Sequence, residues 1–204
     1  MSPAERIEAA AERSPLVRAA LEKARSAHDG QIRNGSGGMP YVEHPMTVAA
    51  RLEEHGHRAE VLAAALLHDV VEDSATTLEE LREEFGDEVA GMVGALTDDE
   101  SIESYRERKA EHRERVSAAS DEALAIYAAD KLTNVVTLKA AYDKEGDSVR
   151  REFKVPLELK LELWEEDLEL LREKAPDLPF LDPLEEALKG LRSQLAAPAP
   201  GPSG

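Results

Sequence analysis

An apolar helical stripe runs into a cluster of ionisable residues between positions 59 and 73. Residues 61, 62, 65 and 66 are apolar and share one helix face, and the same face continues into His68, Asp69, Glu72 and Asp73. Burying so many charged groups is strongly unfavourable unless they pair with one another or bind a metal ion. The pattern therefore indicates a metal site, with a helix end in solvent as the alternative.

A further carboxylate lies in the middle of a second apolar stripe. Ile126, Asp130, Asn134 and Leu138 follow one another at intervals of four, so Asp130 stands between apolar neighbours. A buried carboxylate requires a cation, which could be a metal ion or, alternatively, an arginine or a nearby helix N-terminus. His44 lies in the segment YVEHP, directly before a proline, and is placed at a helix start.

In chain order, these residues match a known signature. His44, the adjacent His68 and Asp69, and Asp130 form the H…HD…D pattern of the HD superfamily of metal-dependent phosphohydrolases. The surrounding sequence resembles one branch, the hydrolase domains of RelA/SpoT-type alarmone enzymes and their small stand-alone relatives. The matching blocks, which extend from about residue 20 to 140, are AHDGQIRNG, PYVEHPMTVA, AALLHDVVEDS, FGDEV with the following TDD, RERK and ADKLTN.

The resemblance implies an all-α HD-domain helical bundle around one metal site. It implies that the metal ligands are His44, His68, Asp69 and Asp130. Two imidazoles and two carboxylates suit Mn²⁺, Fe²⁺ or Zn²⁺ better than an all-oxygen Mg²⁺ site, and the family usually employs Mn²⁺. The implied reaction is attack of water on the 3′-pyrophosphate of ppGpp or pppGpp, which gives GDP or GTP and pyrophosphate.

The resemblance also implies roles for residues around the metal. Glu72 and Asp73 would orient or deprotonate the attacking water. Arg33, in the segment GQIR, would lie against the nucleobase, and Asn134 would contact the ribose or the phosphates.

Three positions that are often basic in the relatives carry no cation here, namely Glu100, Tyr127 and Val136. This favours an alternative substrate with fewer phosphates, such as an adenine alarmone, NADPH or a nucleoside phosphate, cleaved by the same metal chemistry. The cations that could compensate are Arg25, Arg108, Lys109, Lys131 and Lys154. A third interpretation is a nucleotide-binding module without catalysis, but the intact water-orienting pair argues against it.

Helices alone are expected to position these residues, because helix formers dominate and no convincing period-two strand is present. Ser14 and the Thr77–Glu80 capping box mark two helix starts, and residues 28–43, rich in glycine, are expected to form a loop. The expected helices span residues 14–27, 45–55, 59–73, 77–86, 87–96, 105–116, 122–142, 155–172 and 183–194. Residues 1–195 are expected to form a single domain and residues 196–204 a disordered tail.

Composition limits the remaining functions. A net charge of −18 argues against a nucleic-acid partner and requires local cations, or a metal, wherever a phosphate binds. The chain has no cysteine, which excludes disulfides and thiolate ligands. There is no apolar stretch of about 20 residues and no secretory signal, so we expect a cytoplasmic enzyme that acts on a small nucleotide without a membrane partner. The sequence does not predict an oligomeric state.

Overall fold

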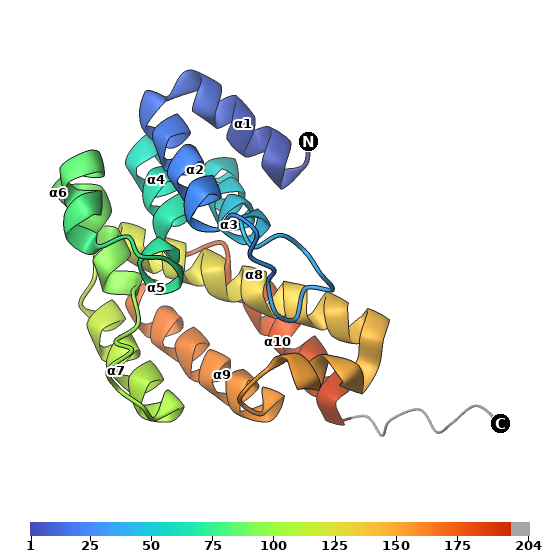
Figure 1. Cartoon of the computed structure of the whole chain (residues 1–204). Coiled ribbons are helices and arrows are strands. Elements are labelled where there is room, and N and C mark those ends of the chain that lie inside the picture. Colours follow the sequence, from blue (N-terminus) through green and yellow to red (C-terminus); the bar gives the residue numbers. More distant parts are fainter. Residues whose placement is uncertain (197–204) are drawn as a thin grey trace.

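The computed structural model describes residues 1–196, and within this range the chain forms helices and no named strand (Figure 1). The all-α prediction is confirmed. The expected tail lies outside the described residues except for Ala196, the last residue of the final helix. The elements are α1 (Pro3–Arg13), α2 (Pro15–Ala27), α3 (Glu43–Glu54), α4 (Ala59–Leu67), α5 (Val70–Asp73), α6 (Leu78–Leu96), α7 (Tyr105–Ser117), α8 (Asp121–Glu145), the 3₁₀ helix η1 (Gly146–Glu152), α9 (Leu157–Lys174) and α10 (Leu181–Ala196).

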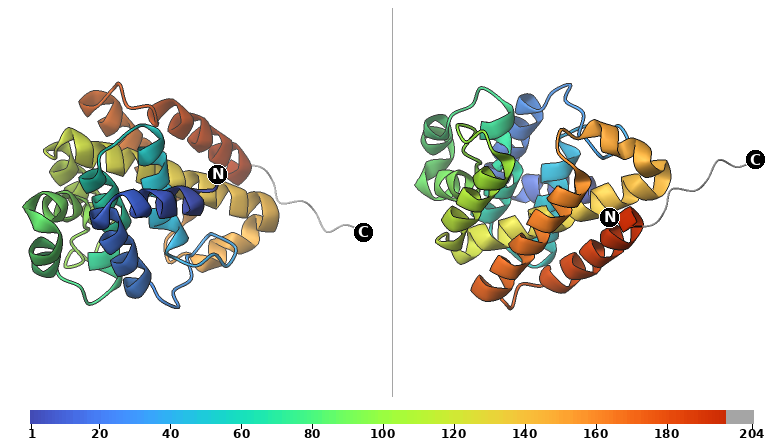
Figure 2. Two further views of the ribbon diagram at one scale, coloured as in Figure 1. Left: turned by 90° about the horizontal axis from the view of Figure 1, so that it is seen from above. Right: turned by 90° about the horizontal axis from the view of Figure 1, so that it is seen from below.

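Helix α8 is the centre of the bundle. Every residue from 123 to 133 is buried, as expected for a helix that is apolar on most of its circumference. Helices α3, α4, α6, α9 and α10 pack against it. In Figure 1, α1 to α4 lie on one side of α8 and α7 and α9 on the other, and both views of Figure 2 show α9 beside α10. Polar groups on α8 are therefore enclosed from several directions.

The helix expected at residues 59–73 is interrupted at His68 and Asp69, two of the predicted metal ligands. Helix α4 ends at Leu67, and α5 begins only at Val70. The backbone angles of Asp69 (φ −96°, ψ −6°) depart from helical values. The physical reason is local: His68 Nδ1 lies 2.8 Å from the carbonyl oxygen of Ala65, which is the acceptor that the Asp69 N–H would use in a continuous helix.

Other helix boundaries differ from the predicted ones by a few residues, with one omission. Helix α1 was not expected, although Ser2 and Glu5 form a capping box at its start. Helix α3 begins at Glu43, two residues before the expected proline. The predicted interruption at Gly86 is confirmed by its φ of +86°. Among the described helices, none combines the length and the apolar composition that a membrane span requires.

The glycine-rich loop between α2 and α3 is fixed to the bundle. Gly35 adopts φ +68°, and a Cβ atom at this position would lie only 2.5 Å from the ring of Phe153. The Gly35 N–H donates a hydrogen bond of 2.6 Å to the carboxylate of Glu152. Ile32 and Pro40 form an isolated β-bridge across the loop. Arg33, which lies between these anchors, therefore has a defined place.

Candidate metal centre and adjoining cavity

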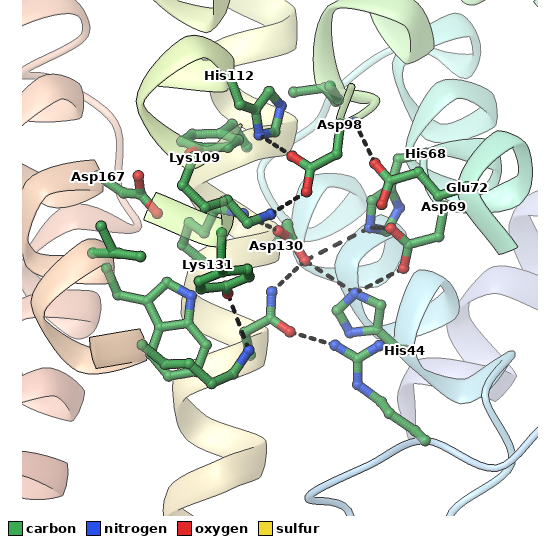
Figure 3. A pocket seen from close by; sticks show the side chains of 18 of the residues that line it. His44, His68, Asp69, Glu72, Asp98, Lys109, His112, Asp130, Lys131 and Asp167 are labelled. Carbon is green, nitrogen blue, oxygen red and sulfur yellow. Dashed lines mark hydrogen bonds and ion pairs between the residues drawn. The ribbon is translucent and has the colours of Figure 1, made fainter. Parts of the chain in front are cut away.

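The four predicted metal ligands come together from three parts of the chain. His44 lies in the first turn of α3, His68 and Asp69 in the turn after α4, and Asp130 in the middle of α8. His44 Nε2 lies 3.0 Å from Asp130 Oδ1 and 3.7 Å from Asp69 Oδ2. His68 Nε2 lies 3.2 Å from Asp69 Oδ1 and 3.6 Å from Asp130 Oδ1. Figure 3 shows these side chains pointing toward one another.

The donor atoms fit a divalent metal ion. One ligand atom each from His44, His68 and Asp130 lies within 4.8 Å of the others, and all three residues are buried. Nδ1 of His68 lies beside the Ala65 carbonyl, which favours the tautomer with its lone pair on Nε2. Within the described residues, Nε2 of both histidines is buried without a hydrogen-bond partner. Buried, unpartnered imidazole nitrogens beside two carboxylates are the arrangement that a metal ion would satisfy.

The surroundings shift the pKa values of the two histidines in opposite directions. Burial lowers the pKa of His44 to about 4, which keeps this imidazole neutral as a metal ligand requires. Burial opposes charge on His68 as well, but the carboxylates of Asp69 and Asp130 outweigh it and raise the pKa of His68 to about 9. The two carboxylates thus attract positive charge strongly at this point.

Neighbouring side chains orient the two carboxylates. The hydroxyl group of Tyr41 donates a hydrogen bond of 2.9 Å to Asp69 Oδ2. Asn134 Nδ2 donates to Asp130 Oδ1 at 2.7 Å, and Lys131 Nζ lies 2.8 Å from Asp130 Oδ2. Sequence reasoning missed Tyr41; it stands three residues before His44, but its spacing gives no sign that its hydroxyl reaches Asp69.

Glu72 and Asp73, predicted as a pair, line different cavities. Glu72 lines the same cavity as the four ligands, whereas Asp73 is exposed and lines the adjoining one. The N–H of Asp98 donates a hydrogen bond of 2.6 Å to Glu72 Oε1. Burial and the charge of Asp69 raise the pKa of Glu72 to about 7, so this carboxylate can exchange a proton near neutral pH.

Two cavities meet beside the predicted metal ligands. The first, with a volume of about 180 Å³, contains the ligands and Glu72. The second, of about 530 Å³, lies within the range of small-molecule sites and includes the apolar side chains of Ile32, Leu138 and Phe153. Both are lined by a shared set of residues, which comprises Arg33, Tyr41, Asn134, Lys160 and Trp164.

The two predicted substrate contacts lie at this junction and touch each other. The guanidinium group of Arg33 donates a hydrogen bond to Asn134 Oδ1 and lies 5.1 Å from the ring centre of Tyr41. Because Asn134 also donates to Asp130, a continuous chain of hydrogen bonds connects Arg33 to this predicted metal ligand.

A second polar cluster supports Glu72 from the opposite side. Asp98 accepts a hydrogen bond of 2.6 Å from Lys109 Nζ and lies 2.9 Å from His112 Nδ1. Its own backbone N–H holds Glu72. Asp98 belongs to the TDD block of the resemblance, but no role was predicted for it, and His112 was not singled out.

The structure shows where two of the positions that are often basic in the relatives, Val136 and Tyr127, lie in this chain. Val136 lines a separate groove between α8 and α10, so an arginine there would not enter the cavity of the metal ligands. Tyr127 does line that cavity. Of the five candidate compensating cations, only Lys109 and Lys131 line it, and both pair with carboxylates.

Comparisons with known proteins identify relatives of this chain. Residues 20–155 match the model of the HD domain family. The guanosine-3′,5′-bis(diphosphate) 3′-pyrophosphohydrolase of Aquifex aeolicus is 33% identical over 72% of this chain and 22% of its own length. The chain thus spans about a fifth of this longer relative. The 3′-pyrophosphohydrolase MESH1 of Xenopus tropicalis is 39% identical over 67% of this chain and 76% of its own length.

Solved structures show the same fold. One, described as "A metazoan ortholog of SpoT hydrolyzes ppGpp and plays a role in starvation responses", is 29% identical and has a TM-score of 0.73 over 89% of this chain and 97% of its own. A protein from Listeria monocytogenes EGD-e is 35% identical, with a TM-score of 0.67 over 74% of this chain and 99% of its own.

Proposed function

The chain belongs to the HD domain family, and on this premise we propose that it is a metal-dependent (p)ppGpp 3′-pyrophosphohydrolase. The reaction would convert ppGpp or pppGpp into GDP or GTP and pyrophosphate. One observation carries the proposal: two imidazoles, two carboxylates and the carboxylate of Glu72 line one cavity, which adjoins a second cavity of nucleoside size. The names of the relatives support the choice of substrate.

We assign His44, His68, Asp69 and Asp130 as the ligands of one divalent ion, for which Mn²⁺ is the first choice and Fe²⁺ or Zn²⁺ are alternatives. A divalent ion in this site supplies Lewis acidity, which polarises a phosphoryl oxygen and favours deprotonation of water. Tyr41 and Asn134 hold the two carboxylates in place.

Glu72 is the proposed proton acceptor. Its Oε1 is held by the Asp98 N–H, and among the described residues nothing donates to Oε2. Oε2 can therefore take the proton of the attacking water, and a pKa of about 7 suits this transfer near neutral pH. Asp73, which lines the second cavity, would act on the water only indirectly.

The second cavity would receive the nucleoside. Arg33 would lie against the base, and Asn134 would contact the ribose or a phosphate. The apolar side chains of Ile32, Leu138 and Phe153 offer the surface that a purine ring needs. The net charge of −18 argues against a nucleic-acid partner, and we propose a small nucleotide as the ligand and the cytoplasm as the location.

One observation favours a different nucleotide. Lys109 and Lys131 line the cavity of the predicted ligands but both pair with carboxylates, so they neutralise little of a substrate that carries several phosphates. A nucleotide with fewer phosphates, such as an adenine alarmone, NADPH or a nucleoside phosphate, would need fewer cations.

The test is an assay of the purified protein with Mn²⁺ and ppGpp, pppApp, NADPH, GTP or dGMP, with the products separated by chromatography. Release of GDP and pyrophosphate from ppGpp is expected. Cleavage of another compound while ppGpp stays intact would select the alternative. If none is cleaved although metal is bound, the protein is not a hydrolase of these nucleotides. The Asp69→Ala variant, purified in parallel, controls for contaminating phosphatases.

A further inference from the structure

Two cations at the junction of the cavities have no carboxylate partner. The cationic side chains that line one or both cavities are Arg33, Lys109, Lys131 and Lys160. Lys109 and Lys131 line only the first cavity and form ion pairs of 2.6 and 2.8 Å. Arg33 and Lys160 line both cavities, and within residues 1–196 neither forms an ion pair. In a protein with a net charge of −18, two unpaired cations at one place require an explanation.

Lys160 lies among aromatic rings instead of carboxylates. Its Nζ atom lies 5.5, 5.1 and 5.4 Å from the ring centres of Tyr105, Phe153 and Trp164. The Tyr105 hydroxyl, at 3.3 Å, is its hydrogen-bond partner. The rings attract the ammonium group, but a partly buried cation remains unfavourable without an anion, and burial lowers the pKa of Lys160. A cation held in this way beside an open cavity is poised for an anionic ligand.

Lys160 also stands outside the part of the chain that the family comparison covers. It lies near the start of α9, beyond residue 155, where the match to the HD domain model ends. Of the three positions where a basic residue is missing, Val136 lines another groove and Glu100 lines neither cavity, so neither position supplies a cation to the cavities. Helix α9 thus brings a cation to the cavities from a distant part of the sequence.

We propose that Lys160 binds the 5′-phosphate groups of the nucleotide substrate. The inference rests on the proposed function, because it takes the reacting 3′-phosphates to lie at the metal ligands and the nucleoside in the second cavity. Lys160 lines that second cavity and Lys109 and Lys131 do not, which places Lys160 on the side of the nucleoside. The 5′-phosphates are the anionic groups of the nucleotide that do not react and that lie on the other side of the ribose from the reacting 3′-phosphates.

Removing the charge of Lys160 separates this role from a structural one. Lys160→Met keeps an unbranched side chain that can pack against the rings, and Lys160→Arg keeps the charge. With ppGpp, the methionine variant should show a KM raised about 10–100-fold with little change in kcat. The reason is that the lost charged hydrogen bond stabilises the bound ground state and the transition state equally. Lys160→Arg should recover most of the affinity. With guanosine 3′-diphosphate, which lacks the 5′-phosphates, Lys160→Met should match the wild type.

Lys174→Met is the matched control, because Lys174 lies on the same helix, is exposed and lines neither cavity. An unchanged KM for ppGpp in Lys160→Met would overturn the proposal, as would an equal rise of KM for both substrates.

A binding experiment separates this proposal from the proposed function. Calorimetric titration of GDP into the wild type and Lys160→Met needs no turnover. If the wild type fails to cleave ppGpp but binds GDP more tightly than the variant, the proposed function fails and the role of Lys160 stands. If GDP affinity is equal in the two proteins, or undetectable in both, the role of Lys160 is excluded whatever the turnover.

Discussion

The two sides of the first cavity are built differently. On one side, α3, the α4–α5 turn and α8 supply the four predicted ligand residues, and α5 supplies Glu72 (Figure 3). On the other side, α7 and α9 supply scattered polar groups, of which Lys109, His112 and Asp167 are labelled in Figure 3. The first side is a fixed set of donors around one point, and the second is a set of charges whose partners decide what they can do.

This difference separates chemistry from substrate choice. A metal centre requires given residue types in one geometry, so the ligand side leaves little room for substitution. The opposite side needs only enough unpaired positive charge, which any helix that reaches the cavity can provide. Lys109 is neutralised by Asp98, while Lys160 is not paired, and this contrast suggests which of them contacts the substrate.

The largest effect is expected from Asp69→Ala. Removing one carboxylate ligand should lower metal affinity by more than about 100-fold, beyond the 10–100-fold typical of residues that only contact a ligand, and turnover should be lost with it. Metal content after dialysis against Mn²⁺ measures the first effect. Asp87→Ala, at a side chain that is 90% exposed, is the control. Normal metal content in Asp69→Ala would remove Asp69 from the ligand set.

Glu72→Gln should lower kcat by about 10²–10⁴-fold while the metal is retained, because the amide keeps an acceptor for the Asp98 N–H but cannot take a proton. Asp73→Asn should have a smaller effect, since Asp73 lines the second cavity. The comparison is made by steady-state kinetics and metal analysis of both variants. Equal losses of kcat would mean that Asp73 shares the role of Glu72.

Tyr41→Phe tests the orientation of the ligands. The substitution removes the donor to Asp69 Oδ2 and should weaken metal binding by about 10–100-fold. Competition with a chelator measures the affinity. Tyr142→Phe removes a comparable hydroxyl contact, to Asp147, away from both cavities and should leave metal affinity unchanged. If both variants behave alike, Tyr41 does not position Asp69.

The smallest effect is expected from Val136→Arg. Because Val136 is 39% exposed and lines the groove between α8 and α10, an added arginine should change kcat/KM for ppGpp by less than about twofold. Lys144→Arg, at an exposed side chain, shows the background variation between preparations. A marked gain of activity in Val136→Arg alone would mean that α8 presents this position to the substrate.

Much of the fold could be read from local patterns. Ser14 caps α2, and Thr77 and Glu80 form the predicted capping box of α6, because these hydrogen bonds involve residues within three positions of each other. The interruption at His68 and Asp69 was not predicted. Apolar periodicity continues through that point, and the hydrogen bond of His68 with Ala65 that replaces a helical one depends on the direction of the ring.

The candidate site was predictable only where residue types follow a pattern. The convergence of His44, His68, Asp69 and Asp130 was expected from their order, and the geometry agrees. The contacts of Tyr41 with Asp69 and of Asp98 with Glu72 join residues 28 and 26 positions apart, and no local pattern indicates them. The ligand and substrate roles themselves stay proposals until the variants are measured.

The sequence by itself determined the helical class, the position of most helices to within a few residues, and the residues that could hold a metal. Capping, apolar periodicity and motif spacing are properties of neighbouring residues. Only the tertiary structure decided which cations reach the cavity. Val136 and Lys160 both lie on long helices, but the packing of α8 against α10 directs one to a separate groove, and the position of α9 brings the other between the two cavities. Such directions depend on contacts between distant helices, which short-range patterns do not encode.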